Sequence, residues 1–181
     1  ACLLTLEMPG DPYPTLRTVL VYPSSFFAAR SPDLRKWSGT SVPEPPLHEL
    51  GEAWSNGTVV IAWEAAMLGG ADAADGHNVV IHEFAHLIDF QLQITPALHL
   101  PARDGVGAAG WARVLTDGSE RLAQLLSLGL PSVLDSYGTT NLAEFFAVAT
   151  EAFFERPEEL RAEYGELYRQ LSGLYRQDPA G

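Results

Sequence analysis

Two short runs of β-branched and aromatic residues predict strands, because residues typical of turns lie at both ends of each run. The runs are 17–22 (RTVLVY) and 57–63 (GTVVIAW). The sequence between them, 31–56, contains many Pro and Ser residues and is predicted to be mostly loop, with one short helix near 32–37. The first third of the chain therefore supplies a small sheet.

The rest of the chain has the apolar periodicity of helices. Segment 78–93 is apolar around most of its circumference, which predicts a helix that is buried on most sides. A loop over 95–110 is expected to follow, and then a helix over 111–128. Asn141 is a good N-cap for a helix over 141–155, and one or two amphipathic helices are expected over 157–177. The pattern predicts an α+β fold.

Composition limits the domain count and the partners. With 181 residues, 46% of them hydrophobic, the chain has enough apolar material for one core, so we expect a single domain over 1–181. A net charge of −12 argues against nucleic acid or an anionic membrane as a partner. No stretch approaches the roughly 20 apolar residues of a membrane span. The single cysteine, Cys2, excludes a disulfide framework, and a reducing cytoplasmic location is expected.

The buried helix carries the sequence His82-Glu83-Phe84-Ala85-His86. Residues four apart share one face of a helix, so the imidazoles of His82 and His86 can bind one metal ion. Glu83 projects to a neighbouring side, where it can take a proton from a water on that ion. Zinc lowers the pKa of such a water to about 7 and polarises a carbonyl. This spacing predicts zinc-dependent hydrolysis of peptide bonds with Glu83 as the general base.

The alternative is that the three residues have this spacing by accident. Ionisable groups inside an apolar helix are costly unless they are paired or bound to metal, which favours the metal site. The segment beginning His48-Glu49 starts in the same way but has Glu52 as its fifth residue and lies in Pro-rich sequence, so it is assigned no role.

Catalytic zinc usually has three protein ligands, so a third is needed. The metzincin pattern would require Gly at position 89 and His at position 92, where this chain has Asp89 and Leu92. His99 is the only histidine further along the chain, and its Pro-flanked loop makes it a poor donor.

The predicted helix over 141–155 is nearly apolar all round, yet three carboxylates fall on one of its stripes. Glu144, in the first turn, is the preferred third ligand. Glu151, two turns further on, is expected to accept a hydrogen bond from a ligand imidazole. A stripe exposed to solvent on a surface helix is the alternative, and Glu155 fits it best.

Three more residues are candidates for the site. Asp89 can share the ligand face of its helix and orient one imidazole, or it can make a local helix contact. Asp135 is the second choice for the third ligand. Tyr137 can donate its hydroxyl to the oxyanion of a tetrahedral intermediate, or it can simply pack.

Several of these segments together resemble the Mlc titration factor A family of zinc peptidases, with the anthrax lethal factor catalytic domain as a more distant relative. They are HNVVIHEFAHLIDF, the Asp-Ser-Tyr triplet, NLAEFFAVATEAFF and the closing LYRQDP. The resemblance extends from about Ala1 to Pro179. It implies that His82, His86 and Glu144 bind one zinc ion, that Glu83 is the base and that Tyr137 is the site tyrosine.

The resemblance also implies an aminopeptidase-like activity and, in enterobacteria, binding to the glucose repressor Mlc. The amino-terminal segment that usually precedes the family's peptidase part is expected to be absent here. We therefore predict a zincin-like domain in which a small sheet packs on the HEFAH helix and the substrate is a peptide. The rival hypothesis is a regulatory module that keeps the metal site but functions by sequestering a transcriptional repressor of sugar uptake.

Overall fold

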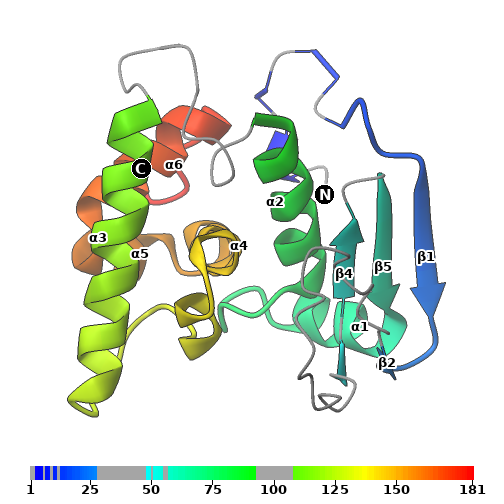
Figure 1. Cartoon of the computed structure of the whole chain (residues 1–181), viewed down its shortest axis with the longest axis horizontal. Helices are drawn as coiled ribbons and strands as arrows, with labels where there is room; N and C mark the ends of the chain where they lie inside the picture. The colour runs from blue at the N-terminus through cyan, green and yellow to red at the C-terminus, as the bar shows by residue number, and fades with distance from the viewer. Residues whose placement is uncertain are drawn as a thin grey trace, which may run out of the picture.

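The fold was analysed in a computed structural model of the chain. It describes residues 3–5, 7–8, 10–11, 13–27, 48–49, 51–54, 57–92 and 108–181. The predicted short helix near 32–37, His99 and most of the predicted loop over 95–110 lie outside these residues. The described part combines a small sheet with a larger helical layer (Figure 1), so the predicted α+β class is confirmed.

The main sheet has three strands in the order β1 (Thr18–Tyr22), β5 (Thr58–Ala62) and β4 (Gly51–Trp54). β1 runs parallel to β5, while β4 runs antiparallel to it. β1 and β5 are the two strands that the hydrophobic runs predicted. β5 is buried and central, whereas β1 and β4 lie at the two edges of the described sheet.

Three strands and one α-helix were not predicted. The segment 31–56, expected to be mostly loop, contains β4 and also β3 (His48–Glu49), which pairs with β2 (Phe26–Phe27) in a separate two-stranded sheet. A helix, α1 (Trp63–Ala71), directly follows β5, so Trp63 begins this helix and does not end the strand. Short strands whose partners are distant along the chain leave little local signal.

Two apolar helices form the centre of the molecule. α2 (Val79–Leu92) packs against the sheet on one side and against α4 (Leu142–Glu155) on the other (Figure 1). Both helices lie within about a residue of their predicted bounds. Because each is covered on more than one side, both have buried residues around most of their circumference. The few polar residues on them are therefore forced into the interior.

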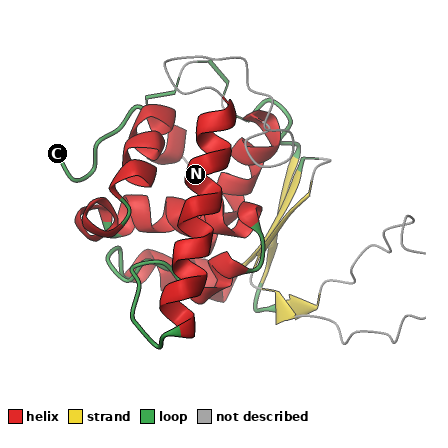
Figure 2. Ribbon diagram, turned by 60° about the vertical axis from the view of Figure 1, so that its left-hand side comes forward, coloured by secondary structure: helices red, strands yellow, loops and turns green. Residues whose placement is uncertain are grey.

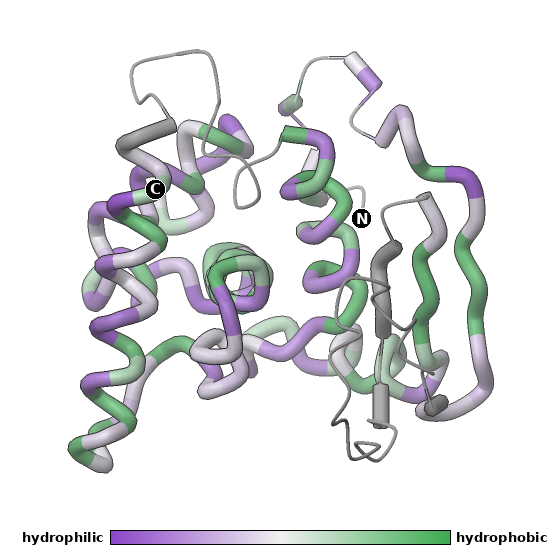
Figure 3. The backbone as a smooth tube through the Cα atoms, in the orientation of Figure 1, coloured by the Kyte–Doolittle hydropathy of each residue, from purple (hydrophilic) through white to green (hydrophobic). Residues whose placement is uncertain are grey.

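The outer helical layer covers the other side of α4 and consists of α3 (Ala108–Ser127), α5 (Pro157–Glu163) and α6 (Gly165–Tyr175). Figure 2 shows these helices gathered away from the strands, and Figure 3 shows polar and apolar residues alternating along α3. Gly118, in the middle of α3, allows a close approach to α4, because a Cβ there would lie 2.6 Å from Cζ of Phe145. None of the helices in the described ranges has both the length and the apolar character needed to cross a membrane.

Candidate metal centre

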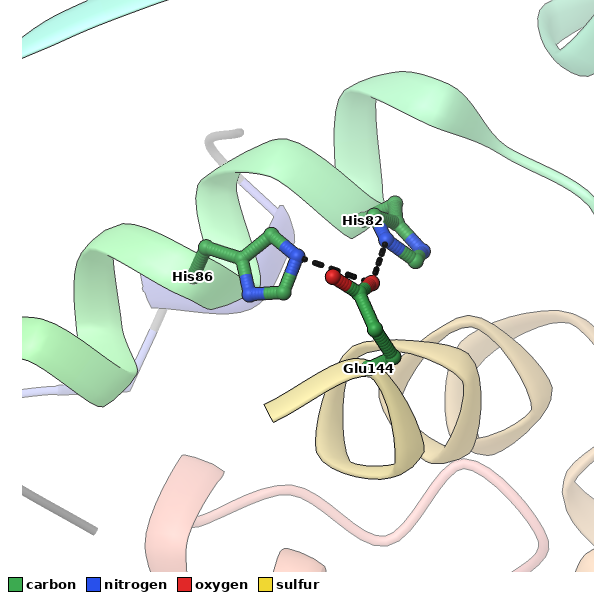
Figure 4. A group of neighbouring side chains, drawn as sticks. All are labelled: His82, His86 and Glu144. Atoms are coloured by element: carbon green, nitrogen blue, oxygen red, sulfur yellow. Dashed lines mark hydrogen bonds and ion pairs between the residues drawn. The ribbon is translucent and has the colours of Figure 1, made fainter. Parts of the chain in front are cut away.

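The start of α2 fixes the direction in which its histidines point. Asn78 acts as the N-cap, because its Oδ1 accepts a hydrogen bond from the backbone N–H of Ile81 at 3.2 Å. One helical turn then separates His82 from His86, whose ring centroids lie 4.9 Å apart. The two imidazoles therefore project from the same face of α2 toward α4 (Figure 4).

Glu144 meets the two histidines from the first turn of α4. Asn141 caps this helix by accepting hydrogen bonds from the N–H groups of Ala143 and Glu144. Oε2 of Glu144 lies 3.0 Å from Nε2 of His82 and 3.3 Å from Nε2 of His86 (Figure 4). The three side chains can each offer one ligand atom, and these atoms all lie within 4.8 Å of one another.

These separations fit a small tetrahedral metal ion. Donor atoms about 2.0 to 2.2 Å from one tetrahedral zinc ion lie about 3.3 to 3.6 Å apart. The two measured separations, 3.0 and 3.3 Å, are close to that value, and two imidazoles with one carboxylate form a known donor set for such an ion. The donor chemistry and the spacing therefore both suit a metal.

Without a metal, the cluster is held together by charge. Burial lowers the pKa of His82, but the hydrogen bonds with Glu144 and Glu151 outweigh burial and raise this pKa to about 10. Burial raises the pKa of Glu144, but the hydrogen bonds with His82 and His86 outweigh it and lower this pKa to about 2. His82 is thus an imidazolium and Glu144 a carboxylate at neutral pH, and a metal ion would replace the proton of His82.

Glu83 and Glu151 lie beside the three candidate ligands. Glu83 follows His82 on α2 and is buried. Glu151 comes from the second turn after Glu144 on α4, and its Oε1 lies 2.7 Å from Nδ1 of His82. Because both ring nitrogens of an imidazolium carry protons, Nδ1–H donates to Glu151 and Nε2–H donates to Glu144. Glu151 thus has the geometry of an acceptor that orients a ligand imidazole.

Tyr137 and Asp135 belong to the short 3-10 helix η2 (Ser136–Thr139) and the residue before it. The ring of Tyr137 is about half exposed, and its centroid lies 6.1 Å from that of His82. Oδ1 of Asp135 accepts a hydrogen bond from the backbone N–H of Tyr137 at 2.7 Å. Asp135 is not part of the cluster of candidate ligands in the described residues, so the structure places it as the cap of the turn that carries Tyr137.

The other candidate carboxylates have different surroundings. Asp89 is completely buried. It lies near Tyr175, whose pKa is raised by the burial of the tyrosine itself and by the charges of Tyr13 and Asp89. The alternative of a solvent-exposed stripe, which fitted Glu155 best, does not hold: the residue is buried, and its Oε1 accepts a hydrogen bond from Nδ2 of Asn78 at 2.9 Å. The sequence indicated Asn78 only as a helix start, because its partners on α4 are more than seventy positions away.

Comparison with known proteins finds a family of metallopeptidases among the matches of this chain. Residues 1–176 match the profile of the family described as glucose-regulated metallo-peptidase M90. An uncharacterized protein of Synechocystis sp. is 38% identical over 99% of this chain and 64% of its own length.

Two proteins named Mlc titration factor A are also similar. The one from Serratia proteamaculans is 30% identical over 98% of this chain and 66% of its own length. The one from Pectobacterium atrosepticum is 32% identical over 89% and 59%. The chain therefore spans about two thirds or less of the length of these relatives.

Proposed function

The chain belongs to the glucose-regulated metallo-peptidase family M90, and from this membership we propose that it is a zinc-dependent peptidase with its active site between α2 and α4. One observation carries the proposal: His82, His86 and Glu144 bring their ligand atoms within 4.8 Å of one another. Glu83, the residue next to His82, would act on a water at the same position. Metal-assisted hydrolysis requires three protein ligands and a nearby base, and the proposal assigns these roles to the four residues.

In this proposal one zinc ion is held by Nε2 of His82, Nε2 of His86 and a carboxylate oxygen of Glu144. When bound, zinc lowers the pKa of a water to about 7 and polarises the scissile carbonyl. Glu151 fixes the ring of His82 by accepting its Nδ1–H, so that Nε2 faces the ion. Asp89, three residues after His86 on α2, is proposed to orient one of the ligand imidazoles through a hydrogen bond.

The proton transfers fall to Glu83. It takes a proton from the attacking water as the water adds to the carbonyl carbon, and it then donates that proton to the amine that leaves. Tyr137 donates its hydroxyl to the carbonyl oxygen while that oxygen carries negative charge. The half-exposed position of Tyr137 next to His82 supports this role, because the donor has to reach a substrate at the surface of the site.

The arrangement of α2 beside a small sheet supports a zincin-like active site. β4 packs against α2 and lies at an edge of the described three-stranded sheet. We propose that the substrate adds to this edge as an extended peptide, as peptides do at exposed sheet edges. By family resemblance we extend the proposal to an aminopeptidase-like activity, and the single cysteine is compatible with a cytoplasmic location.

The test is cleavage of a mixed peptide library, read by mass spectrometry, with zinc-loaded parent protein and a Glu83→Gln variant. We expect the variant to bind zinc as the parent does but to cleave about 10²- to 10⁴-fold more slowly, because only the base is lost. Glu120→Gln, the same change at an exposed position of α3, is the control and should be fully active. A Glu83→Gln variant that cleaves at the parent rate would remove Glu83 from the mechanism.

The same experiment addresses the rival function. Two of the relatives are named for titration of Mlc, and the rival hypothesis is a regulatory module that binds a transcriptional repressor. That hypothesis predicts no cleavage by the parent protein and equal repressor binding by the parent and the Glu83→Gln variant. Cleavage by the parent alone favours the peptidase.

A further inference from the structure

Asn78 lies where three helices meet, and it contacts all of them. Its Nδ2 donates to the carbonyl of Gly69 on α1 at 3.1 Å and to Oε1 of Glu155 on α4 at 2.9 Å. Its Oδ1 caps α2 through the N–H of Ile81. Its own backbone N–H donates to Oε2 of Glu151 at 2.5 Å. One residue thus connects the end of α1, the start of α2 and the carboxylates of α4.

We propose that Asn78 is a positioning residue for the metal centre. Asn78 acts on His82 through Glu151, and its own position depends on the close packing of Gly69 against it. The inference rests on the proposed function only in taking His82 as a metal ligand. The chain of contacts is short: Gly69 and Glu155 hold the side chain of Asn78, its backbone holds one oxygen of Glu151, and the other oxygen of Glu151 holds His82.

Glu151 needs both contacts to orient an imidazole. Oε1 bonds to Nδ1 of His82 and Oε2 to the backbone of Asn78, so the carboxylate is fixed at both oxygens. The N–H of Asn78 is also one of the donors at the start of α2, where the helix dipole favours a negative charge. If residue 78 moves, the carboxylate is free to rotate and the imidazole loses its fixed acceptor.

Only an amide side chain suits all the partners of Asn78. The cap requires an acceptor, since its partner is the N–H of Ile81, while the carbonyl of Gly69 and the carboxyl of Glu155 are acceptors and require a donor. An aspartate has the same shape but no donor when ionised. It would therefore keep the cap and repel both other partners. Serine would keep the cap and lose the donor to α4 without adding a charge.

Gly69 allows α1 to approach residue 78 closely enough for this contact. A Cβ at position 69 would lie 2.8 Å from the carbonyl oxygen of His77 and 3.0 Å from Cα of Asn78. Both atoms belong to the backbone, so the start of α2 would have to move. Gly70, the next residue of the same helix, has nothing within 4 Å of the equivalent position. The two glycines therefore form a matched pair for substitution, because only Gly69 lies against Asn78.

The experiment measures zinc affinity by competition with a chelator for the parent, Asn78→Asp, Asn78→Ser, Gly69→Ala and Gly70→Ala. We expect Asn78→Asp and Gly69→Ala to bind zinc about 10- to 100-fold more weakly, as for other residues that orient metal ligands. Asn78→Ser should be weakened in the same direction but less, and Gly70→Ala should bind as the parent does. Circular dichroism of each metal-free variant shows whether it is folded.

A second readout separates positioning from a purely structural role. The Nδ1–H proton of His82, bonded to Glu151, should give a downfield proton resonance in the metal-free parent, and this resonance should weaken or shift in Asn78→Asp and Gly69→Ala. Adding Glu155→Gln to Asn78→Asp restores a donor opposite the new carboxylate, so it should recover the resonance and most of the zinc affinity.

Parent-like zinc affinity in both Asn78→Asp and Gly69→Ala, with an unchanged His82 resonance, would overturn the proposal. If Asn78→Asp does not fold, Asn78→Ser and Gly69→Ala decide the question in the same way. None of these readouts depends on peptide cleavage. A parent protein that binds zinc but cleaves nothing would contradict the proposed peptidase and leave this inference fully testable.

Discussion

The central helix α4 and the edge strand β1 have similarly apolar sequences but very different surroundings. Ten of the fourteen residues of α4 are buried, including two of its carboxylates, because α2, α3, α5 and α6 contact it from several sides. All five residues of β1 are exposed, with Val19 at 43% and Val21 at 56%. Among the described residues β1 pairs with β5 alone. Apolar composition alone therefore does not determine burial.

The difference explains where the chemistry lies. A carboxylate or imidazole that is forced between packed helices loses water, so it must find a partner, and that partner holds it in one orientation. Glu144, Glu151 and Glu155 all meet this condition on α4, whereas β1 carries no ionisable side chain except the phenol of Tyr22. The helix pair α2 and α4 is thus both the core and the candidate site.

The largest effect is expected from a cavity between α4 and α6. Phe153 on α4 is fully buried, and its ring centroid lies 5.2 Å from that of Tyr168 and 5.7 Å from that of Tyr175. Phe153→Ala should lower the free energy of unfolding by about 3 to 5 kcal/mol. Urea unfolding measures this change. Tyr22→Ala on β1 is the control in the exposed region and should cost about 1 kcal/mol. Equal losses from the two variants would mean that burial in α4 is not what distinguishes the regions.

The next effect concerns the third ligand. Glu144→Ala should weaken zinc binding by at least about 100-fold, since it removes a ligand and not merely a supporting residue. Asp135→Ala should leave the affinity near that of the parent, because Asp135 caps the turn before Tyr137. Zinc-dependent thermal stabilisation measures both, as a ligand that binds only the folded protein stabilises it. If Asp135→Ala alone loses zinc, the third ligand is assigned to the wrong residue.

The charges of the site give a pH dependence. The pKa of His82 in the folded metal-free protein, about 10, is above its ordinary value of 6.5, so the stability it contributes is complete below pH 6.5 and is lost as the pH rises toward 10. The pKa of Glu144, about 2, is below its ordinary value of 4.5, so its contribution is present above pH 4.5 and is lost as the pH falls toward 2.

Zinc binding must therefore release a proton from His82 at neutral pH. The apparent affinity should rise by up to about tenfold per pH unit between pH 6.5 and 8.5. Calorimetry in buffers with different ionisation enthalpies measures the released proton directly. Binding without proton release would show that His82 is already neutral in the metal-free protein, so that it is not an imidazolium paired with the carboxylate of Glu144.

Sequence reasoning indicated the parts of the candidate site that depend on helix periodicity. The spacing of His82 and His86 and the stripe of carboxylates on α4 follow from one helical repeat, so they are visible without a fold. The partner of Glu155 could not be found in this way, because Asn78 reaches it only when α1, α2 and α4 have packed. Glu155 therefore seemed to belong to a solvated stripe at the end of its helix.

The same limit applies to the fold. β1, β5, α2 and α4 each have a clear hydrophobic pattern over at least five residues, and they were predicted within one or two residues of their bounds. α1 was missed because its sequence, WEAAMLGGA, has no distinct apolar face, has two adjacent glycines before its last residue and lacks a capping side chain. β4 was missed because its pairing with β5 is what makes it a strand.

The smallest effect is expected from a change on β1 itself, and the sheet provides its own control. Val19 on β1 lies directly opposite Val59 on β5, yet Val19 is 43% exposed and Val59 is completely buried. Threonine has nearly the shape of valine, so Val→Thr adds a hydroxyl with little change of volume. Val59→Thr should cost about 1 to 3 kcal/mol, because the hydroxyl is buried, whereas Val19→Thr should change stability by about 0.5 kcal/mol or less. Urea unfolding compares the two, and zinc affinity should be unchanged in Val19→Thr. A cost at Val19 as large as that at Val59 would show that β1 is covered in solution, and the contrast between the exposed strand and the buried helix pair would then not hold.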